Sequence, residues 1–168
     1  MSDNLSIKQI HSISPHRNEL TELLIEVVQD GASIGFLPPL SVADAEHYWD
    51  HVVNPDAVLF VAAINQRVVG SVQLHLCTKP NGTHRAEIAK LMTRPSFRRN
   101  GIGRLLMQAA EERGKQENRS LLVLDTREGD PSNRLYTSLG YEQAGRIPCY
   151  AQSADGSLDA TVIYYKII

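Results

Sequence analysis

The sequence has little cysteine and no long apolar run, and each shortage excludes a class of protein. Only two of its 168 residues are cysteine, Cys77 and Cys149, and neither belongs to a Cys-x-x-Cys pair. Isolated cysteines are typical of a reducing compartment, so we expect buried thiols rather than a disulfide framework. The longest apolar run covers only residues 57–64, whereas a membrane-spanning helix needs roughly twenty residues.

Excess charge of either sign is absent as well. Lysine and arginine total 17 against 19 acidic residues, which leaves a net charge of −2 and argues against a nucleic-acid partner. The first ten residues are not a basic stretch followed by an apolar block, so no secretory signal is predicted. Hydrophobic residues make up 42% of the chain, enough to fill one core. We expect a cytoplasmic protein with a single domain over residues 1–168, and neither membrane nor nucleic acid as a partner.

Two stretches have the apolar spacing of amphipathic helices. In the first, between residues 14 and 30, leucines and valines recur at i, i+3, i+4 and i+7. The second begins at Ser41, which forms a capping-box pattern with Asp44, and ends before the Asn-Pro pair at 54–55. Residues 31–40 between them contain glycines and two prolines, which predicts a loop.

The rest of the chain has the pattern of an α/β fold. β-Branched and apolar runs at 57–64 and 68–76 predict a hairpin, and residues 85–93, 121–126, 141–150 and 160–168 predict further strands. A helix is expected from Gly101 and a short one over 135–139. The strand, helix and strand between 85 and 126 predict a right-handed unit whose two strands are parallel.

One short segment differs from the rest in charge. Between Thr93 and Arg104 the chain has four arginines and no acidic residue. Gly101 and Gly103 lie in the same segment, at the expected start of a helix, where missing β-carbons let backbone N–H groups approach an anion. These features predict a pyrophosphate site, with a solvated basic turn as the alternative. The dinucleotide-binding motif needs a third glycine at position 106, where this chain has leucine, and the Gly-Lys-Ser/Thr sequence of the Walker motif is absent. Neither of these two phosphate-binding motifs is therefore predicted.

Two motifs carry a resemblance to a known family. Residues 98–103, Arg-Arg-Asn-Gly-Ile-Gly, resemble the Arg/Gln-x-x-Gly-x-Gly/Ala loop of the GNAT N-acetyltransferases, and residues 133–141 resemble their Asn-x-x-Tyr-x-x-x-Gly-Tyr/Phe signature. The resemblance implies the GNAT fold, a mixed, mostly antiparallel sheet of about seven strands with a central splayed parallel pair and about four flanking helices. It also implies acetyl-CoA as cosubstrate, no metal, and acetyl transfer to an amine or hydroxyl.

Further segments are similar to the tabtoxin resistance acetyltransferases within this family. They are residues 31–36, 79–82, 85–87, 90–92, 124–126, 155–156 and 163–164. This similarity implies a small-molecule acceptor, such as the antimetabolite tabtoxinine-β-lactam. Acetylation of another small metabolite or of a protein N-terminus is the alternative.

The resemblance implies a set of cofactor-binding residues. The loop at 98–104 would hold the pyrophosphate, the strand before it would offer main-chain groups to the pantetheine arm, and the later signature would touch the cofactor. The set comprises Leu91, Met92, Thr93, Arg98, Arg99, Asn100, Gly101, Ile102, Gly103, Arg104, Asn133 and Tyr136.

Three residues are candidates for catalysis. Tyr136 matches the family tyrosine that faces the CoA sulfur, and a phenol with a pKa of about 10 can protonate a departing thiolate. Glu87 and Asp125 fall on the two predicted parallel strands, in apolar surroundings where we expect them buried, and burial raises the pKa of a carboxyl group. Glu87 is the candidate base, directly or through water, and Asp125 assists it or binds the acceptor. Ion pairs with Lys90 or Arg85 are the alternative role.

The candidates for acceptor binding are Ser33, Phe36, Gln73, His75 and Tyr150. Ser33 also fits the Gly-x-Ser-x-Gly pattern of serine hydrolases, but the strand-to-helix turn that this motif needs is not predicted here. A substrate-covering loop is the preferred interpretation, and a Ser33 hydrolase and a non-enzymatic CoA-binding sensor remain alternatives.

One pair of histidines has a spacing that metal ligands can have. His47 and His51 are spaced i, i+4, yet no third ligand is evident, so they predict a solvated helix face. Open terminal strands would allow either a monomer or a homodimer.

Overall fold

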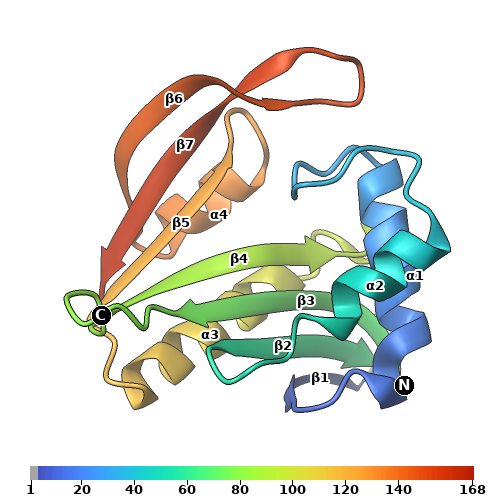
Figure 1. Ribbon diagram of the computed structural model, residues 1–168, viewed down its shortest axis with the longest axis horizontal. Coiled ribbons are helices and arrows are strands. Elements are labelled where there is room, and N and C mark those ends of the chain that lie inside the picture. The colour runs from blue at the N-terminus through green and yellow to red at the C-terminus, as the bar shows by residue number, and fades with distance from the viewer. Residues whose placement is uncertain (1–3) are drawn as a thin grey trace.

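The chain forms one seven-stranded sheet with helices on both faces (Figure 1). The computed structural model describes residues 4–168. In spatial order the strands are β1 (Leu5–Ile10), β2 (Ala57–Ile64), β3 (Arg67–Leu76), β4 (Arg85–Thr93), β5 (Leu121–Arg127), β7 (Leu158–Ile167) and β6 (Glu142–Gln152). The helices are α1 (Arg17–Gln29), α2 (Val42–Asp50), α3 (Ile102–Gln116) and α4 (Ser132–Ser138).

A single parallel pair lies at the centre of the sheet. Within residues 4–168, β4 and β5 are parallel and all other neighbouring strands are antiparallel. Helix α3 connects β4 to β5, as the predicted strand–helix–strand unit requires. The expected α/β architecture, a mixed and mostly antiparallel sheet with a central parallel pair and four helices, is therefore confirmed.

Most predicted elements are present, with small differences in their bounds. Helix α1 begins at Arg17 rather than at Pro15 after a Ser14 cap, because Ser14–His16 form a 3-10 turn. Ser41 caps α2, and its Oγ accepts a hydrogen bond of 3.0 Å from the Asp44 amide. The sequence prediction missed β1, which pairs with β2 along its whole length. That strand has only six residues, and polar side chains interrupt its apolar pattern.

The expectation of buried thiols is wrong. Cys149 is exposed and Cys77 is only half-buried. Cys149 lies on β6, the last strand at one edge of the sheet, where almost every side chain faces solvent. In residues 4–168 no helix is both long enough and apolar enough to cross a membrane.

The sheet separates two hydrophobic cores. Helices α1 and α2 cover one face, where Leu24 and Trp49 pack against Leu59 of β2. Helix α3 covers the other face, where Leu106 packs against Leu122 of β5. Figure 1 shows α3 behind the sheet and the α1–α2 pair in front of it. A ligand that enters between two strands can therefore reach both layers of the molecule.

The parallel strands stay together for only a short distance. Pairing of β4 with β5 covers Arg85–Glu87 opposite Leu121–Val123 and then stops. Strand β4 continues to Thr93 beside β3, and β5 continues beside β7, so the two strands diverge (Figure 1). The β3–β4 register shifts near Gln73, and Lys90 has a left-handed φ of 54°, which are the features of a bulge. The bulge bends β4 away from β5.

A buried arginine fixes the end of β4. Arg94 is 0% exposed, and its Nε donates to the Val68 carbonyl at 2.7 Å. Its two terminal nitrogens donate to the Glu19 carbonyl and to the carboxylate of Glu26, and Glu22 lies at 3.4 Å. The guanidinium thus joins β3, β4 and α1 through charge-assisted hydrogen bonds.

We expect Arg94→Met to destabilise the protein strongly. The methionine fills part of the volume but leaves the buried carbonyls without a donor, which costs about 3 kcal/mol of unfolding free energy. Urea unfolding followed by circular dichroism measures the loss. Arg146→Met is the matched control, because Arg146 forms an exposed pair with Glu128 and exposed pairs contribute little. Equal unfolding midpoints for Arg94→Met and the wild type would contradict this role.

Candidate active site

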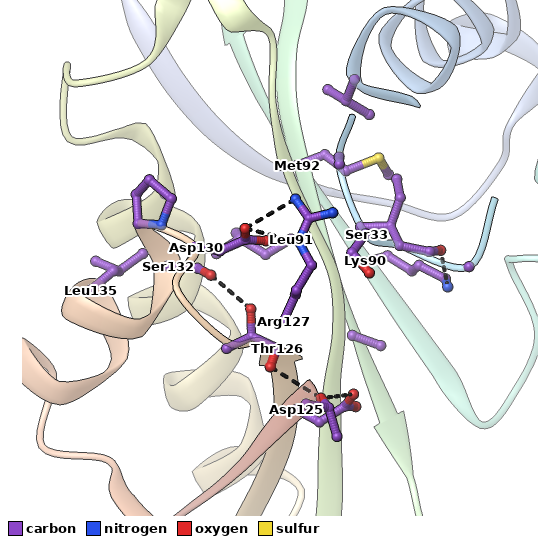
Figure 2. A pocket seen from close by; sticks show the side chains of 18 of the residues that line it. Ser33, Lys90, Leu91, Met92, Asp125, Thr126, Arg127, Asp130, Ser132 and Leu135 are labelled. Atoms are coloured by element: carbon purple, nitrogen blue, oxygen red, sulfur yellow. Dashed lines mark hydrogen bonds and ion pairs between the residues drawn. The ribbon is translucent and has the colours of Figure 1, made fainter. Parts of the chain in front are cut away.

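A cleft opens where β4 and β5 diverge. Its volume is about 620 Å³, and its walls come from β4, β5, the first turn of α4, the end of α1 with residues 30–35, and the β6–β7 hairpin. Figure 2 shows Lys90, Leu91 and Met92 on the β4 side and Asp125, Thr126 and Arg127 on the β5 side. The cleft has the size of an ordinary small-molecule site.

Side-chain alternation along the strands gives the cleft two different sides. Leu122 and Leu124 of β5 and Ile88 of β4 point into the α3 core. Successive side chains point to opposite faces of a sheet, so Glu87 and Asp125 belong to the face that α1 and α2 cover. We call this side of the cleft, with Glu87, Asp125 and Arg127, the acidic side.

The two predicted carboxylates line the cleft, but they are not buried. Glu87 and Asp125 are both exposed, which corrects the expectation of buried acids. The reason is the divergence of the strands, which opens their apolar surroundings to solvent. Thr161 Oγ1 donates to Asp125 Oδ2 at 3.0 Å. Among residues 4–168 neither carboxylate has an ion-pair partner, and Arg85 instead contacts Cys77 Sγ.

Lys90 lines the same cleft, although it was expected only as an alternative ion-pair partner of the carboxylates. Its ammonium donates to the Ile34 carbonyl and lies 5.7 Å from the centre of the Phe36 ring. Burial lowers the pKa of Lys90, and the Asp125 and Glu87 carboxylates partly oppose this. Lys90 therefore ties β4 to the loop that covers the cleft.

Tyr136 lies on the other side of the cleft. It is only 6% exposed, and its ring packs 6.0 Å from that of Tyr141 and 5.9 Å from that of Tyr164. Burial raises the pKa of Tyr136, and the carboxylates of Asp125 and Asp130 raise it further. The phenol consequently stays protonated and available as a proton donor at neutral pH.

Half of the predicted cofactor set lines the cleft. These residues are Leu91, Met92, Thr93, Arg98, Gly103 and Tyr136. Arg98 is half-exposed and pairs with Asp30 at the end of α1. Arg99, Asn100 and Gly101 lie in the exposed turn before α3, outside the lining, and Arg104 donates to Ser138 Oγ at 2.7 Å.

The start of α3 has the shape of a cradle. Gly101 caps the helix with a left-handed φ of 76°, a conformation that glycine adopts without strain. A β-carbon on Gly103 would lie 3.3 Å from Leu135 Cδ2 and 3.9 Å from Leu91 Cδ2, so its absence leaves space between α3, α4 and β4. The free N–H groups of this helix start suit the pyrophosphate of a nucleotide cofactor.

Two predicted cofactor residues have structural contacts instead. Ile102 is 1% exposed and belongs to the α3 core. The Asn133 amide donates at 2.9 Å to the carbonyls of Arg127 and Asp130, and its oxygen accepts from the Tyr164 hydroxyl at 2.9 Å. Asn133 thus stabilises the turn that precedes α4 and does not line the cleft.

The acceptor candidates fall into two groups. Ser33 and Tyr150 line the cleft, whereas Phe36, Gln73 and His75 are not among its lining residues. Gln73 is 2% exposed, donates to the Tyr48 hydroxyl at 2.7 Å, and pairs with His75 Nε2 at 2.8 Å. Partial burial lowers the pKa of His75, while the neighbouring Glu87 opposes this.

The hydrolase and metal alternatives find no support in this geometry. Ser33 lies in an irregular segment after α1, not at a turn from strand to helix, which the nucleophile motif requires. His47 of α2 and His51 at its C-terminal cap are exposed, and their rings lie 4.6 Å apart with planes tilted by 55°. Residues 4–168 contain no group of three or more His, Cys, Asp or Glu side chains arranged to hold a metal ion.

Comparison with known proteins decides the family. The model of the acetyltransferase (GNAT) family matches residues 21–141, which span α1 to α4 and most of the cleft. The chain belongs to the GNAT acetyltransferase family. Members of this family use acetyl-CoA, which agrees with the cradle at α3.

The relatives of this acetyltransferase share its fold more than its sequence. An uncharacterized N-acetyltransferase of Azospirillum brasilense is 30% identical over 66% of this chain and 68% of its own length. The ribosomal-protein-alanine N-acetyltransferase of Brucella melitensis superposes with a TM-score of 0.82 at 18% identity, covering 96% of this chain and 99% of its own. A Salmonella typhimurium protein solved with its cofactor acetyl-CoA has a TM-score of 0.79 at 15% identity, covering 96% and 93%.

Sequence reasoning missed three residues that shape the site of this GNAT protein. They are Lys90, Arg127 and Asp130, all of which line the cleft. Arg127 and Asp130 lie directly after the apolar part of β5, and ligands of open α/β sheets gather at such strand ends. That position and the i, i+3 spacing of the Arg127–Asp130 pair were the available signals.

Proposed function

We propose that this protein transfers the acetyl group of acetyl-CoA to an amine or hydroxyl of a small molecule. The observation that supports the proposal most directly is the cleft between β4 and β5, which has an anion cradle at one end and acid–base groups at the other. Membership of the GNAT family supports the same reaction class.

The residues of the cleft fit the parts of the coenzyme in order. The N-terminus of α3, with Gly103 and Arg98, would hold the pyrophosphate through N–H groups and positive charge. Leu91 and Met92 would offer main-chain groups along β4 to the pantetheine arm. When bound there, acetyl-CoA supplies an activated acetyl thioester. The protein positions it beside the acceptor, and positioning of this kind accounts for much of the rate gain in two-substrate reactions.

Proton transfer would use groups on both sides of the cleft. Glu87 accepts the proton that the acceptor nitrogen or oxygen loses, directly or through one water, and Asp125 assists it or holds the acceptor. Tyr136 donates its proton to the departing sulfur. Thr161 fixes the Asp125 carboxylate by its hydrogen bond, so this group has a defined direction toward the acceptor.

The proposed acceptor is an antimetabolite of amino-acid size, such as tabtoxinine-β-lactam. Support comes from the short segments that resemble tabtoxin resistance acetyltransferases, of which residues 31–35 and 125–126 line the cleft. Assays should begin with this compound and continue with other small amines.

We expect Gly103→Val to weaken acetyl-CoA binding by at least about tenfold, because its side chain would fill the cradle between α3 and β4. Isothermal titration calorimetry measures the affinity. Gly145→Val is the matched control, since a β-carbon at Gly145 meets nothing within 4 Å. If the wild type takes up no acetyl-CoA at millimolar concentration, the proposed function is wrong.

We expect Tyr136→Phe to lower kcat by about a hundredfold, in the range found for general acids, while acetyl-CoA affinity stays within about twofold. The raised pKa of Tyr136 also predicts that the phenol causes no alkaline fall in wild-type kcat up to about pH 9. Thiol release at saturating acceptor, followed across pH, measures both. Tyr165→Phe is the control, because the Tyr165 hydroxyl donates to the exposed Glu142 carboxylate of the edge strand β6. Unchanged turnover would remove Tyr136 from the mechanism.

We expect Glu87→Gln to lower kcat for amine acceptors by at least about a hundredfold, since the amide cannot accept the proton. Acetyl-CoA affinity should be unaltered in calorimetry. Glu112→Gln on the exposed side of α3 is the control for the loss of one carboxylate. A loss of activity in Asp125→Asn together with full activity in Glu87→Gln would move the role of base to Asp125.

A further inference from the structure

A buried side-chain amide lies in the sheet close to the proposed base. Gln73 of β3 is only 2% exposed, and a buried amide is costly unless its polar groups are hydrogen-bonded. Its Nε2 donates to the Tyr48 hydroxyl of α2 at 2.7 Å, and its Oε1 lies 2.8 Å from Nε2 of His75. Gln73 therefore connects a helix on one side to an imidazole ring on the other.

The contact with Gln73 determines which nitrogen of His75 carries the proton. A side-chain amide oxygen only accepts hydrogen bonds, so Nε2 of His75 donates to Gln73 Oε1. In the neutral ring the other nitrogen, Nδ1, then has a free lone pair. His75 can bind a second proton at Nδ1 while its hydrogen bond to Gln73 persists. The amide thus orients the ring and leaves Nδ1 as the atom that exchanges protons.

His75 lies directly opposite Glu87 on the neighbouring strand. The two residues are partners in the β3–β4 ladder. Both belong to the face of the sheet that α1 and α2 cover, because Leu74 and Ile88 beside them point into the α3 core. Residues opposite each other in antiparallel strands have β-carbons about 5 Å apart. The imidazole is therefore within reach of the Glu87 carboxylate, directly or through one water.

His75 lies on the side of Glu87 that faces away from the cleft. Strand β4 lies between β3 and β5 (Figure 1), and Glu87 lines the cleft whereas His75 does not. His75 is exposed, so water has access to its ring. An acceptor bound in the cleft would cover Glu87 on the β5 side and leave the β3 side open. A proton on Glu87 consequently has an exit through His75 while the cleft is occupied.

The surroundings of His75 keep its ring neutral at neutral pH. Partial burial lowers the pKa of His75, the Glu87 carboxylate opposes this, and the Lys90 ammonium lowers it further. Both charged groups come from β4. On α2, burial raises the pKa of Tyr48, so its hydroxyl stays uncharged. On β2 the residue opposite His75 is Ala57, which has no charge. The neutral ring has its Nδ1 lone pair available for a proton.

We propose that His75 receives the acceptor's proton from Glu87 and passes it to water, with Gln73 as the residue that positions its ring. The inference rests on the proposed acetyl transfer and extends it by one step. Glu87 first binds the proton that the acceptor nitrogen loses. The O–H bond of the Glu87 carboxyl group then breaks as an N–H bond forms at His75 Nδ1, which restores the carboxylate and leaves an imidazolium. The imidazolium releases that proton to water before the next turnover.

NMR of the imidazole nitrogens tests the positioning without any acceptor. At mildly alkaline pH the wild-type His75 should be the Nε2–H tautomer. Gln73→Leu keeps the side-chain volume but removes the hydrogen-bond acceptor, so His75 should become a mixture of both tautomers. Tyr48→Phe should cause a smaller change in the same direction, because Gln73 loses the hydroxyl that orients its amide. A wild-type Nδ1–H tautomer, or the wild-type ratio in both variants, would overturn the positioning by Gln73.

Replacement of His75 tests the proton transfer. With acetyl-CoA and a small amine both saturating, His75→Ala should lower kcat at least about tenfold, less than Glu87→Gln, because Glu87 can still lose its proton slowly to water. The acceptor KM and the acetyl-CoA affinity should stay within about twofold, since His75 does not line the cleft. His47→Ala is the matched control, because His47 is an exposed histidine on α2.

Chemical rescue distinguishes proton transfer from a structural role. Removal of the exposed ring leaves space beside Glu87, so free imidazole should raise kcat of His75→Ala at least about fivefold and leave Glu87→Gln unaltered. In the wild type, protonation of His75 should lower kcat as the pH falls below about 6.5, the ordinary imidazole pKa, with a midpoint under that value. In His75→Ala this fall should shift to lower pH.

The outcomes separate this inference from the proposed function. Full turnover of His75→Ala, or a loss that imidazole does not restore, overturns the proton transfer to His75 and leaves acetyl transfer intact. Absence of CoA release from the wild type with every amine tested overturns the proposed function for amines, and this step with it. The NMR experiment still decides, in that case, whether Gln73 sets the tautomer of His75.

Discussion

The site of this protein depends on the early end of the pairing between β4 and β5. After Glu87 and Val123 the two strands share no ladder, although each keeps its partner on the outer side. Their inner backbone groups therefore face the gap, and unpaired N–H and C=O groups are costly unless water or a ligand satisfies them. An extended molecule with amide groups can satisfy both edges at once, in the manner of an added strand. The pantetheine arm of acetyl-CoA has this chemistry, which explains why one gap in a sheet suits the coenzyme of the GNAT family.

Such a gap would close if nothing held the strands apart. On one side, the buried Arg94 anchors the end of β4 to α1 and β3, and the bulge at Lys90 directs the strand toward them. On the other side, the Asn133 amide holds the turn after β5, and Tyr164 of β7 holds Asn133 in turn. These anchors are polar and directional, unlike the apolar contacts of the two cores, so they specify a position as well as contributing stability. The cleft is thus part of the folded framework, present before any ligand binds.

The sequence predicted what local patterns determine and failed where distant segments meet. Apolar spacing located α1, α2 and α3, and the glycine pair at 101 and 103 marked the start of α3 correctly. Glu87 and Asp125 were expected to be buried because their sequence neighbours are apolar, but the divergence of two strands is not visible in either strand alone. Asn133 has the spacing of a ligand-binding residue, yet its amide is occupied by the turn before α4. The contacts of Lys90 and Arg127 with Ile34, Gly31 and Ser153 could not be predicted, since these partners lie far away in sequence.

The alternation of side chains along the strands also separates the two halves of the proposed reaction. Tyr136 lies on the α3 side, where burial raises its pKa and keeps its proton. Glu87 lies on the opposite side, exposed, in the same cleft as residues 31–35, whose carbonyls accept hydrogen bonds from Lys90 and Arg127. A proton donor and a proton acceptor in one site need different environments, or they would simply neutralise each other. Here the sheet itself provides the difference, because one strand presents successive residues to a dry core and to an open cleft. In the proposed reaction the acceptor would lose its proton on one face and the sulfur would gain one from the other, an order that the pleat of β4 and β5 would set.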